Sequence, residues 1–181
     1  EPHSEETRHR IEEIYGAKAY NSYGLSEVNG PGVAFECVFQ NGMHLWEDYY
    51  ILEILNPQTL SPTAPGEVGE IVLTTIYRDA TPLIRYRTGD LAFLLDEPCP
   101  CGRTHRRISR IQGRTDDMFI FRGVNVFPMQ IEKVLMSNPE VGNNYRIVLE
   151  REDYRDTMIV EVEIKPELFS GDVQKLARLK E

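Results

Sequence analysis

The sequence contains no long hydrophobic run, no signal-peptide pattern and no excess of positive charge. A helix that crosses a membrane needs about 20 consecutive, mostly apolar residues. A protein that binds nucleic acid generally needs a basic face to meet the phosphates. Here 20 lysines and arginines stand against 29 aspartates and glutamates, which gives a net charge of -9. We therefore expect neither a membrane nor a nucleic acid as a partner.

Cysteine is also scarce, with three residues in a chain of 181. Small secreted domains that are held together by disulfides are much richer in cysteine. Cys99 and Cys101 are moreover too close in the chain to pair comfortably with each other. These features argue against a disulfide scaffold and favour a reducing, cytoplasmic setting.

Apolar residues make up 41% and charged residues 27% of the chain, an ordinary balance for a globular protein. The first residues predict a surface helix that leads into strands. Because a domain seldom begins inside such a helix, we expect a further region upstream. The segment 17–112 is strand-rich, and its clearest signals predict a helix at 5–15, strands at 17–21, 50–55, 69–75 and 91–95, and a turn at 23–27.

The pattern changes after Gly113. Pro128 suits the first turn of a helix, and apolar residues recur at helical spacing from there to Asn138. The segment as a whole predicts a small α+β unit of β-α-β-β-α order. Its expected elements are a strand at 118–122, a turn at 123–125, a helix at 128–138, strands at 145–150 and 158–164, and a helix at 173–180.

The first chemically suggestive motif is Tyr-Gly-Leu-Ser-Glu at 23–27. The ring of Tyr23 could lie flat against an adenine because Gly24 has no side chain to obstruct it. The hydroxyl of Ser26 could donate to a phosphate oxygen, and the carboxylate of Glu27 could help to hold Mg²⁺. A tight turn with a packed tyrosine is the alternative explanation.

The second and third motifs are Arg-Tyr-Arg-Thr-Gly-Asp at 85–90 and Gly-Arg-Thr-Asp-Asp at 113–117. Asp90 could accept charge-assisted hydrogen bonds from both hydroxyls of a ribose. Arg114 brings a planar guanidinium that suits phosphate or ribose oxygens. The arginines of the second motif could balance carboxylates or contact phosphate. The adjacent carboxylates of the third motif point in different directions and make a poor acid–base pair.

In this order, the three motifs resemble the later core motifs of the adenylate-forming superfamily of acyl- and aryl-CoA synthetases. Ile-Arg-Tyr-Arg-Thr-Gly-Asp at 84–90 and Arg-Gly-Val-Asn-Val-Phe-Pro at 122–128 are similar to the phenylacetate–CoA ligases of phenylacetate catabolism. The resemblance implies a mixed α/β and α+β fold. Residues 1–114 would be the strand-rich end of the large adenylate-forming domain, 115–117 a hinge, and 118–181 a small mobile domain, incomplete at its C-terminus.

The resemblance also implies a reaction in two steps. An aryl carboxylic acid attacks the α-phosphate of ATP and releases pyrophosphate, and the thiol of coenzyme A then displaces AMP. Tyr23 beside Gly24 would stack on the adenine, Ser26 would lie near the α-phosphate, and Glu27 would assist Mg²⁺. Asp90 would hold the ribose hydroxyls.

Four further residues receive roles from the same resemblance. Arg114 would contact ribose or phosphate, and Asp116 would be the hinge about which the small domain swings. Arg122 and Gly123 would lie on the loop that approaches the thiol of coenzyme A.

Two elements of the family are missing from the sequence. The Gly/Ser/Thr-rich phosphate loop does not occur, and Lys175 and Lys180 have no glycine beside them, as the adenylating lysine would. We therefore expect this chain alone to be inactive in full adenylation, with most of the acid pocket upstream. A ligase of the coenzyme F390 synthetase type, which transfers no coenzyme A, and a non-catalytic zinc-stapled binding module are the alternatives. The acid and the oligomeric state stay open, and a homodimer is possible.

The cysteines suggest a metal site of their own. Cys37 and His44 form one pair, and Cys99 and Cys101 form a Cys-x-Cys pair in a proline-rich loop. Three thiolates and one imidazole match a closed tetrahedral zinc site, and soft sulfur ligands select zinc over magnesium or calcium. His105 is the rival fourth ligand, and three reduced cysteines without a metal are the alternative.

Overall fold

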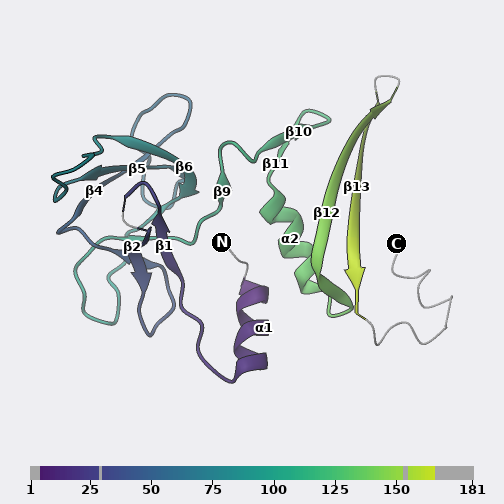
Figure 1. The fold of residues 1–181 in the computed structure, drawn as a ribbon, viewed down its shortest axis with the longest axis horizontal. Coiled ribbons are helices and arrows are strands. Elements are labelled where there is room, and N and C mark those ends of the chain that lie inside the picture. The colour runs from purple at the N-terminus through teal and green to yellow at the C-terminus, as the bar shows by residue number, and fades with distance from the viewer. Residues whose placement is uncertain (1–4, 29, 153–154, 166–181) are drawn as a thin grey trace. The chain divides into compact units, whose positions relative to one another are not determined.

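The computed structural model describes residues 5–28, 30–152 and 155–165, and the chain divides into two compact units (Figure 1). The first consists mainly of Ile11–Met118, and the second mainly of the residues from Phe119 onward. Strands dominate both units, and helices are few, which confirms the predicted mixed α/β and α+β class. No helix in the described residues has the length and apolar character of a membrane span.

The first unit contains two antiparallel sheets. One has the strand order β1-β2-β3-β8-β7, and the other has the order β4-β5-β6-β9. Neighbouring strands in both sheets run antiparallel. The strands are β1 (Ser22–Leu25), β2 (Gly30–Glu36), β3 (Met43–Leu45), β4 (Tyr50–Leu55), β5 (Gly69–Thr75), β6 (Tyr86–Ala92), β7 (Leu94–Leu95), β8 (Arg107–Ile108) and β9 (Gly113–Arg114).

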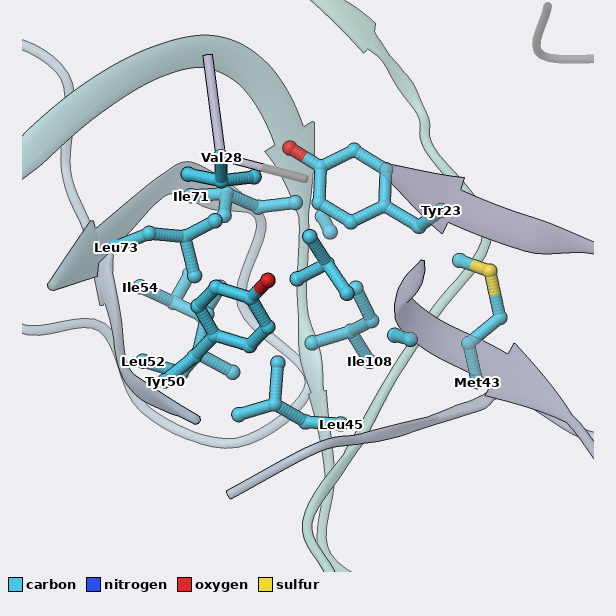
Figure 2. Packing of buried hydrophobic residues seen from close by; sticks show 13 residues of the cluster. Tyr23, Val28, Met43, Leu45, Tyr50, Leu52, Ile54, Ile71, Leu73 and Ile108 are labelled. Atoms are coloured by element: carbon cyan, nitrogen blue, oxygen red, sulfur yellow. The ribbon is translucent and has the colours of Figure 1, made fainter. Parts of the chain in front are cut away.

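The hydrophobic core of this unit draws side chains from both sheets (Figure 2). Leu45 and Ile108 come from the first sheet, and Ile71 and Leu73 come from β5 of the second; all four are fully buried. Successive residues of a strand point to opposite faces, so Ile71 and Leu73 share the face that meets the first sheet. Burial of this apolar surface is the main force that holds the two sheets together.

Two arginines of the second motif balance carboxylates. Arg85 forms a two-pronged ion pair with Glu53, with distances of 3.0 and 3.1 Å. Nε and Nη2 of Arg87 both donate to one oxygen, Oε2, of Glu70, whose side chain is buried on β5. A buried carboxylate needs such a partner, because burial of an unpaired charge is costly. The positions of Arg85 and Arg87 thus favour a role in balancing carboxylates over a role in contacting phosphate.

The second unit is built from two hairpins and a helix. Pro128 occupies the first turn of α2, where its missing N–H costs nothing, and the Gln130 side chain accepts a hydrogen bond from the backbone N–H of Phe127. The predicted helix at 173–180 lies outside the described residues. The elements are β10 (Phe119–Phe121), β11 (Val124–Val126), α2 (Pro128–Ser137), β12 (Val141–Glu152) and β13 (Arg155–Ile164), while α1 (Glu5–Tyr15) is divided between the units.

Several predicted boundaries are wrong. The first strand lies at Ser22–Leu25 and not at 17–21, so most of the motif predicted as a turn is strand. The register of the pairing between β1 and β2 shifts between Tyr23 and Gly24. Because of this irregularity, the strand can pair with β2 although it contains a glycine. Residues 124–126 are also a strand, with the turn at 122–123. Of the aromatic residues near β3 and β4, Trp46 and Tyr49 are exposed, whereas Tyr50 is buried.

The carboxylate of Glu12 near the end of α1 yields a pH prediction. It accepts hydrogen bonds from the backbone N–H of Ala19 at 3.0 Å and from the Gln40 side chain at 2.8 Å. These bonds lower the pKa of Glu12 from 4.5 to about 2. A lowered pKa means that the contribution of this carboxylate to stability is complete above pH 4.5 and is lost as the pH falls through about 2.

A carbon-13 NMR titration of the Glu12 carboxyl group checks this expectation. We expect Gln40→Leu to raise the midpoint, because one of the two main donors is removed. A wild-type midpoint at the ordinary glutamate value would contradict the described contacts.

Candidate nucleotide-facing site and cysteine–histidine cluster

The three sequence motifs meet at the carboxylate of Asp90. The Tyr23 hydroxyl donates to Oδ2 of Asp90 at 2.8 Å, and Nη1 of Arg114 donates to Oδ1 at 2.8 Å. Asp90 on β6 lies directly opposite Arg114 on β9, so the strand register creates the ion pair. Residues that are 67 and 24 positions apart in the chain thus share one carboxylate.

The Thr-Gly dipeptide before Asp90 has a local structural reason. The Thr88 hydroxyl donates to the carbonyl of Ile71 at 2.9 Å and accepts from the backbone N–H of Asp90 at 3.1 Å. Gly89 has a φ of +78°, and a side chain there would begin 3.0 Å from Nη2 of Arg114. Glycine therefore provides both the backbone conformation and the space that Arg114 needs. The positioning role of Thr88 was not predicted, although its place within the second motif was a usable signal.

Arg114 also forms a fork with Asp116. Its Nε and Nη2 atoms donate to the two carboxylate oxygens of Asp116, both at 2.8 Å. The side chain of Asp90 is 13% exposed and that of Asp116 is 62% exposed. The guanidinium of Arg114 thus joins the mostly buried carboxylate of Asp90, the inner one, to the exposed carboxylate of Asp116, the outer one. The planar guanidinium of an arginine is suited to this geometry because it can donate in several directions at once.

The electrostatics differ between the two carboxylates. Burial raises the pKa of Asp90, although the hydrogen bonds from Tyr23 and Arg114 act in the opposite direction. The hydrogen bonds from Arg114 lower the pKa of Asp116, and the same contacts raise the pKa of Arg114. Arg114 thus favours the ionised form of both carboxylates.

The rest of the first motif lies around a turn at the end of β1. Tyr23 is 6% exposed and packs in the hydrophobic core (Figure 2), and its hydroxyl reaches Asp90. Stacking on adenine would need a free face of this ring. Ser26 and Glu27 are exposed on the turn, and the guanidinium of Arg78 donates to the carbonyl of Glu27. Sequence reasoning did not single out Arg78, which stands in no recognisable motif.

Glu27 does not belong to a preformed metal site in residues 5–28, 30–152 and 155–165. The cysteines and His44 form the single cluster of three or more potential ligands found in this part of the chain. A magnesium ion at Glu27 would therefore need oxygen ligands from the nucleotide and from water, as Mg²⁺ commonly does.

The segment expected near coenzyme A forms the tight turn between β10 and β11. Arg122 and Gly123 have φ values of 50° and 82°. The guanidinium of Arg122 donates to the carbonyl of Asp156 at 3.1 and 3.2 Å and lies 5.1 Å from the centre of the Phe121 ring. The turn thus has a fixed connection to β13 within its own unit.

The cysteine cluster is assembled from three parts of the first unit. Cys37 follows β2, His44 lies on β3, and Cys99 and Cys101 lie in the loop between β7 and β8. The sulfurs of Cys37 and Cys99 are 3.6 Å apart, and the Cys101 sulfur lies 3.4 Å from Nε2 of His44. All four potential ligand atoms lie within 4.8 Å of one another.

The surroundings of this cluster differ between its members. Cys37, His44 and Cys99 are buried. A hydrogen bond from the backbone of Arg103 lowers the pKa of Cys101 to about 7, while burial raises the pKa of Cys99 and lowers that of His44. His105, the rival ligand from the sequence, is not in the cluster, and its ring lies 6.2 Å from that of Trp46.

Two of the arginines between residues 103 and 114 have partners within the protein. Arg106 pairs with Glu47 at 2.6 Å. Arg107 is buried and donates to the backbone carbonyls of Asn41 and Glu97. Arg106 and Arg107 therefore tie loops together, whereas Arg114 reaches Asp90.

Comparison with known proteins gives the class first. Residues 123–181 match the AMP-binding enzyme C-terminal domain. The fold is also that of a solved 2-hydroxyisobutyryl-CoA ligase in its postadenylation state, in complex with R3-HIB-AMP. That structure is 32% identical to this chain and has a TM-score of 0.88, covering 96% of this chain and 37% of the ligase. The chain thus has the architecture of the C-terminal region of an adenylate-forming CoA ligase.

Curated relatives with higher sequence identity are phenylacetate-coenzyme A ligases. The chain is 49% identical over 170 residues to the phenylacetate-coenzyme A ligase of Thermus thermophilus, which covers 93% of this chain. It is 45% identical over 166 residues to the enzyme of the same name from Escherichia coli, which covers 91% of this chain. The predicted resemblance to the C-terminal part of the phenylacetate–CoA ligases is confirmed. The chain spans 38% and 37% of the lengths of these two relatives.

Proposed function

We propose that this chain is the nucleotide-facing C-terminal portion of an ATP-dependent ligase that joins an aryl acid, phenylacetate, to coenzyme A. The observation that carries the proposal is the convergence of Tyr23 and Arg114 on Asp90, with Asp116 bound to the other side of the same guanidinium. A carboxylate held in this way is suited to a sugar diol. The names of the relatives support the acid and the acceptor.

Asp90 retains the capacity to bind a ribose while it holds its protein partners. A carboxylate offers about four lone-pair sites on its two oxygens. Tyr23 and Arg114 use one site on each oxygen, so each oxygen can accept one further hydrogen bond from a ribose hydroxyl. Tyr23 acts here as a positioning residue, and its adenine-stacking role stays a prediction.

The remaining nucleotide contacts are proposed from the exposed turn after β1. Ser26 would donate to the α-phosphate, and Glu27 would supply one oxygen ligand to Mg²⁺, whose charge offsets that of the phosphates. The carboxylate oxygen of the acid would attack the α-phosphorus, and the bond to pyrophosphate would break. An acyl-adenylate results.

The second half-reaction is proposed to use the hinge and the β10–β11 turn. Asp116 lies in the turn at 115–117, directly before the boundary between the two units. A few residues in such a turn can absorb a large dihedral change. The turn at Arg122 and Gly123 would then approach the thiol of coenzyme A. The sulfur would form the thioester bond as AMP leaves.

The test is a reaction with the full-length protein that carries this chain. With phenylacetate, ATP and Mg²⁺ we expect release of pyrophosphate, and on addition of coenzyme A we expect AMP and phenylacetyl-CoA. Pyrophosphate release with no thioester would favour the alternative of an adenylyl transferase that uses another acceptor. Absence of ATP binding in calorimetry of the full-length protein would overturn the proposal in favour of a non-catalytic module.

A further inference from the structure

We propose that Cys37, His44, Cys99 and Cys101 bind one Zn²⁺ ion, which fastens the β2–β3 turn to the loop between β7 and β8. Nothing in the proposed ligase reaction requires this site. Its role is structural, because four protein ligands leave no coordination position for water or substrate.

The distances within the cluster fit a zinc tetrahedron. Zn–S bonds of about 2.3 Å and Zn–N bonds of about 2.0–2.1 Å require ligand separations of about 3.8 Å between sulfurs and about 3.6 Å between sulfur and nitrogen. The corresponding pairs are 3.6 Å apart for Cys37 and Cys99 and 3.4 Å apart for Cys101 and His44. No pair of ligand atoms exceeds 4.8 Å, so small side-chain rotations complete the shell.

The alternatives explain the cluster less well. A disulfide needs a sulfur–sulfur distance of about 2.0 Å, well below the 3.6 Å between Cys37 and Cys99. A disulfide would also leave Cys101 and His44 in contact without a function. Free cysteines usually behave as small hydrophobic residues, yet here three thiols and an imidazole converge from separate segments. Sulfur with imidazole nitrogen is the donor set that zinc favours.

The loop that carries two of the ligands has little regular structure to hold it. Gly102, with a φ of +80°, lets the chain turn sharply so that its N–H donates to the carbonyl of Cys99 at 3.0 Å. Arg107 provides a second tie between the same two segments through the carbonyls of Asn41 and Glu97. A metal would therefore add a further connection between two loops that Arg107 already joins.

The fastened loop forms one wall of a cavity of about 290 Å³. Phe35 on β2 and Trp46, directly after β3, line the cavity on one side, and Arg103 and His105 contribute from the loop. Without the metal, the four ligand side chains would lose their common attachment and this wall would be free to move. Zinc content and loop order are thus expected to change together.

The test uses the full-length protein, purified without chelators. Elemental analysis is expected to give one zinc per chain, and X-ray absorption is expected to show three sulfur ligands and one nitrogen ligand. His44→Ala is expected to lose the zinc, and its matched control His105→Ala is expected to keep it. Removal of zinc by a strong chelator is expected to lower the melting temperature of wild type and of His105→Ala alike.

Three results would overturn the proposal: wild-type protein with substoichiometric zinc, a mass two hydrogens lower that reports a disulfide, or zinc that washes out with no change in melting temperature. The X-ray absorption measurement needs no variant, so the test holds even if His44→Ala fails to fold. Metal content is read independently of ligase activity, so its outcome is separate from that of the proposed function.

Discussion

Asp90→Ala is expected to lower kcat/KM for ATP by about 100- to 10,000-fold in the full-length protein. Each hydrogen bond to a charged group contributes about 1.5–3 kcal/mol, and Asp90 is proposed to make two with the ribose. Each 1.4 kcal/mol corresponds to about a tenfold change in rate. The substitution also leaves the Arg114 guanidinium without its inner carboxylate. Steady-state kinetics of pyrophosphate release at varied ATP concentration measure the effect.

Two variants separate nucleotide binding from general damage. Asp90→Asn keeps the shape of the side chain but not its charge, and we expect an intermediate loss of about 10- to 100-fold. Asp48→Ala removes an exposed carboxylate from the turn between β3 and β4 and is expected to leave the kinetics unchanged. An unaltered KM for ATP in folded Asp90→Ala protein would contradict the proposed ribose contact.

Leu73→Ala is expected to lower the free energy of unfolding by about 2–5 kcal/mol, the usual range for a leucine in a closely packed core. Leu73 is 0% exposed on β5 and packs among side chains from both sheets (Figure 2). Its truncation removes apolar contacts and leaves a cavity that β5, with strands on both sides, cannot easily collapse to fill. Urea unfolding followed by tryptophan fluorescence measures the loss, because the single Trp46 lies in the same unit.

The matched control is Ile51→Ala on the neighbouring strand. Ile51 is 50% exposed on β4 and lies in the same pair of strands. We expect a loss below about 1 kcal/mol, because an exposed methyl group has little transfer energy to lose. Equal effects at the two positions would show that the core is not where the structure places it.

The sequence predicted those elements whose signals are local. The strands Tyr50–Leu55 and Gly69–Thr75 were predicted with the bounds that the structure shows. Apolar residues fill them, and turn residues mark their ends. The start of α2 followed in the same way from Pro128. The strand at Ser22–Leu25 was misplaced because its pairing with β2, across a register shift, outweighs the turn preference of its glycine.

The sequence predicted which residues belong to the candidate site, but not which of them contact one another. The motifs named Tyr23, Asp90 and Arg114, yet the bridge of Arg114 to two carboxylates depends on the register of β6 and β9. Likewise, the sequence could not choose between His44 and His105. The pairing of β3 with β8 places His44 opposite Arg107 and beside the cysteine loop. Such registers are set by contacts between distant segments, which local patterns do not contain.

The fork of Arg114 has a further consequence for motion. A rotation at 115–117, which the proposed hinge requires, would separate Arg114 from one of its two carboxylates. Ions in solution weaken exposed pairs far more than buried ones, so the weaker arm is the one to Asp116, which is 62% exposed, and not the one to Asp90. Raising the ionic strength is therefore expected to weaken the ion pair between Arg114 and Asp116 more than the pair between Arg114 and Asp90.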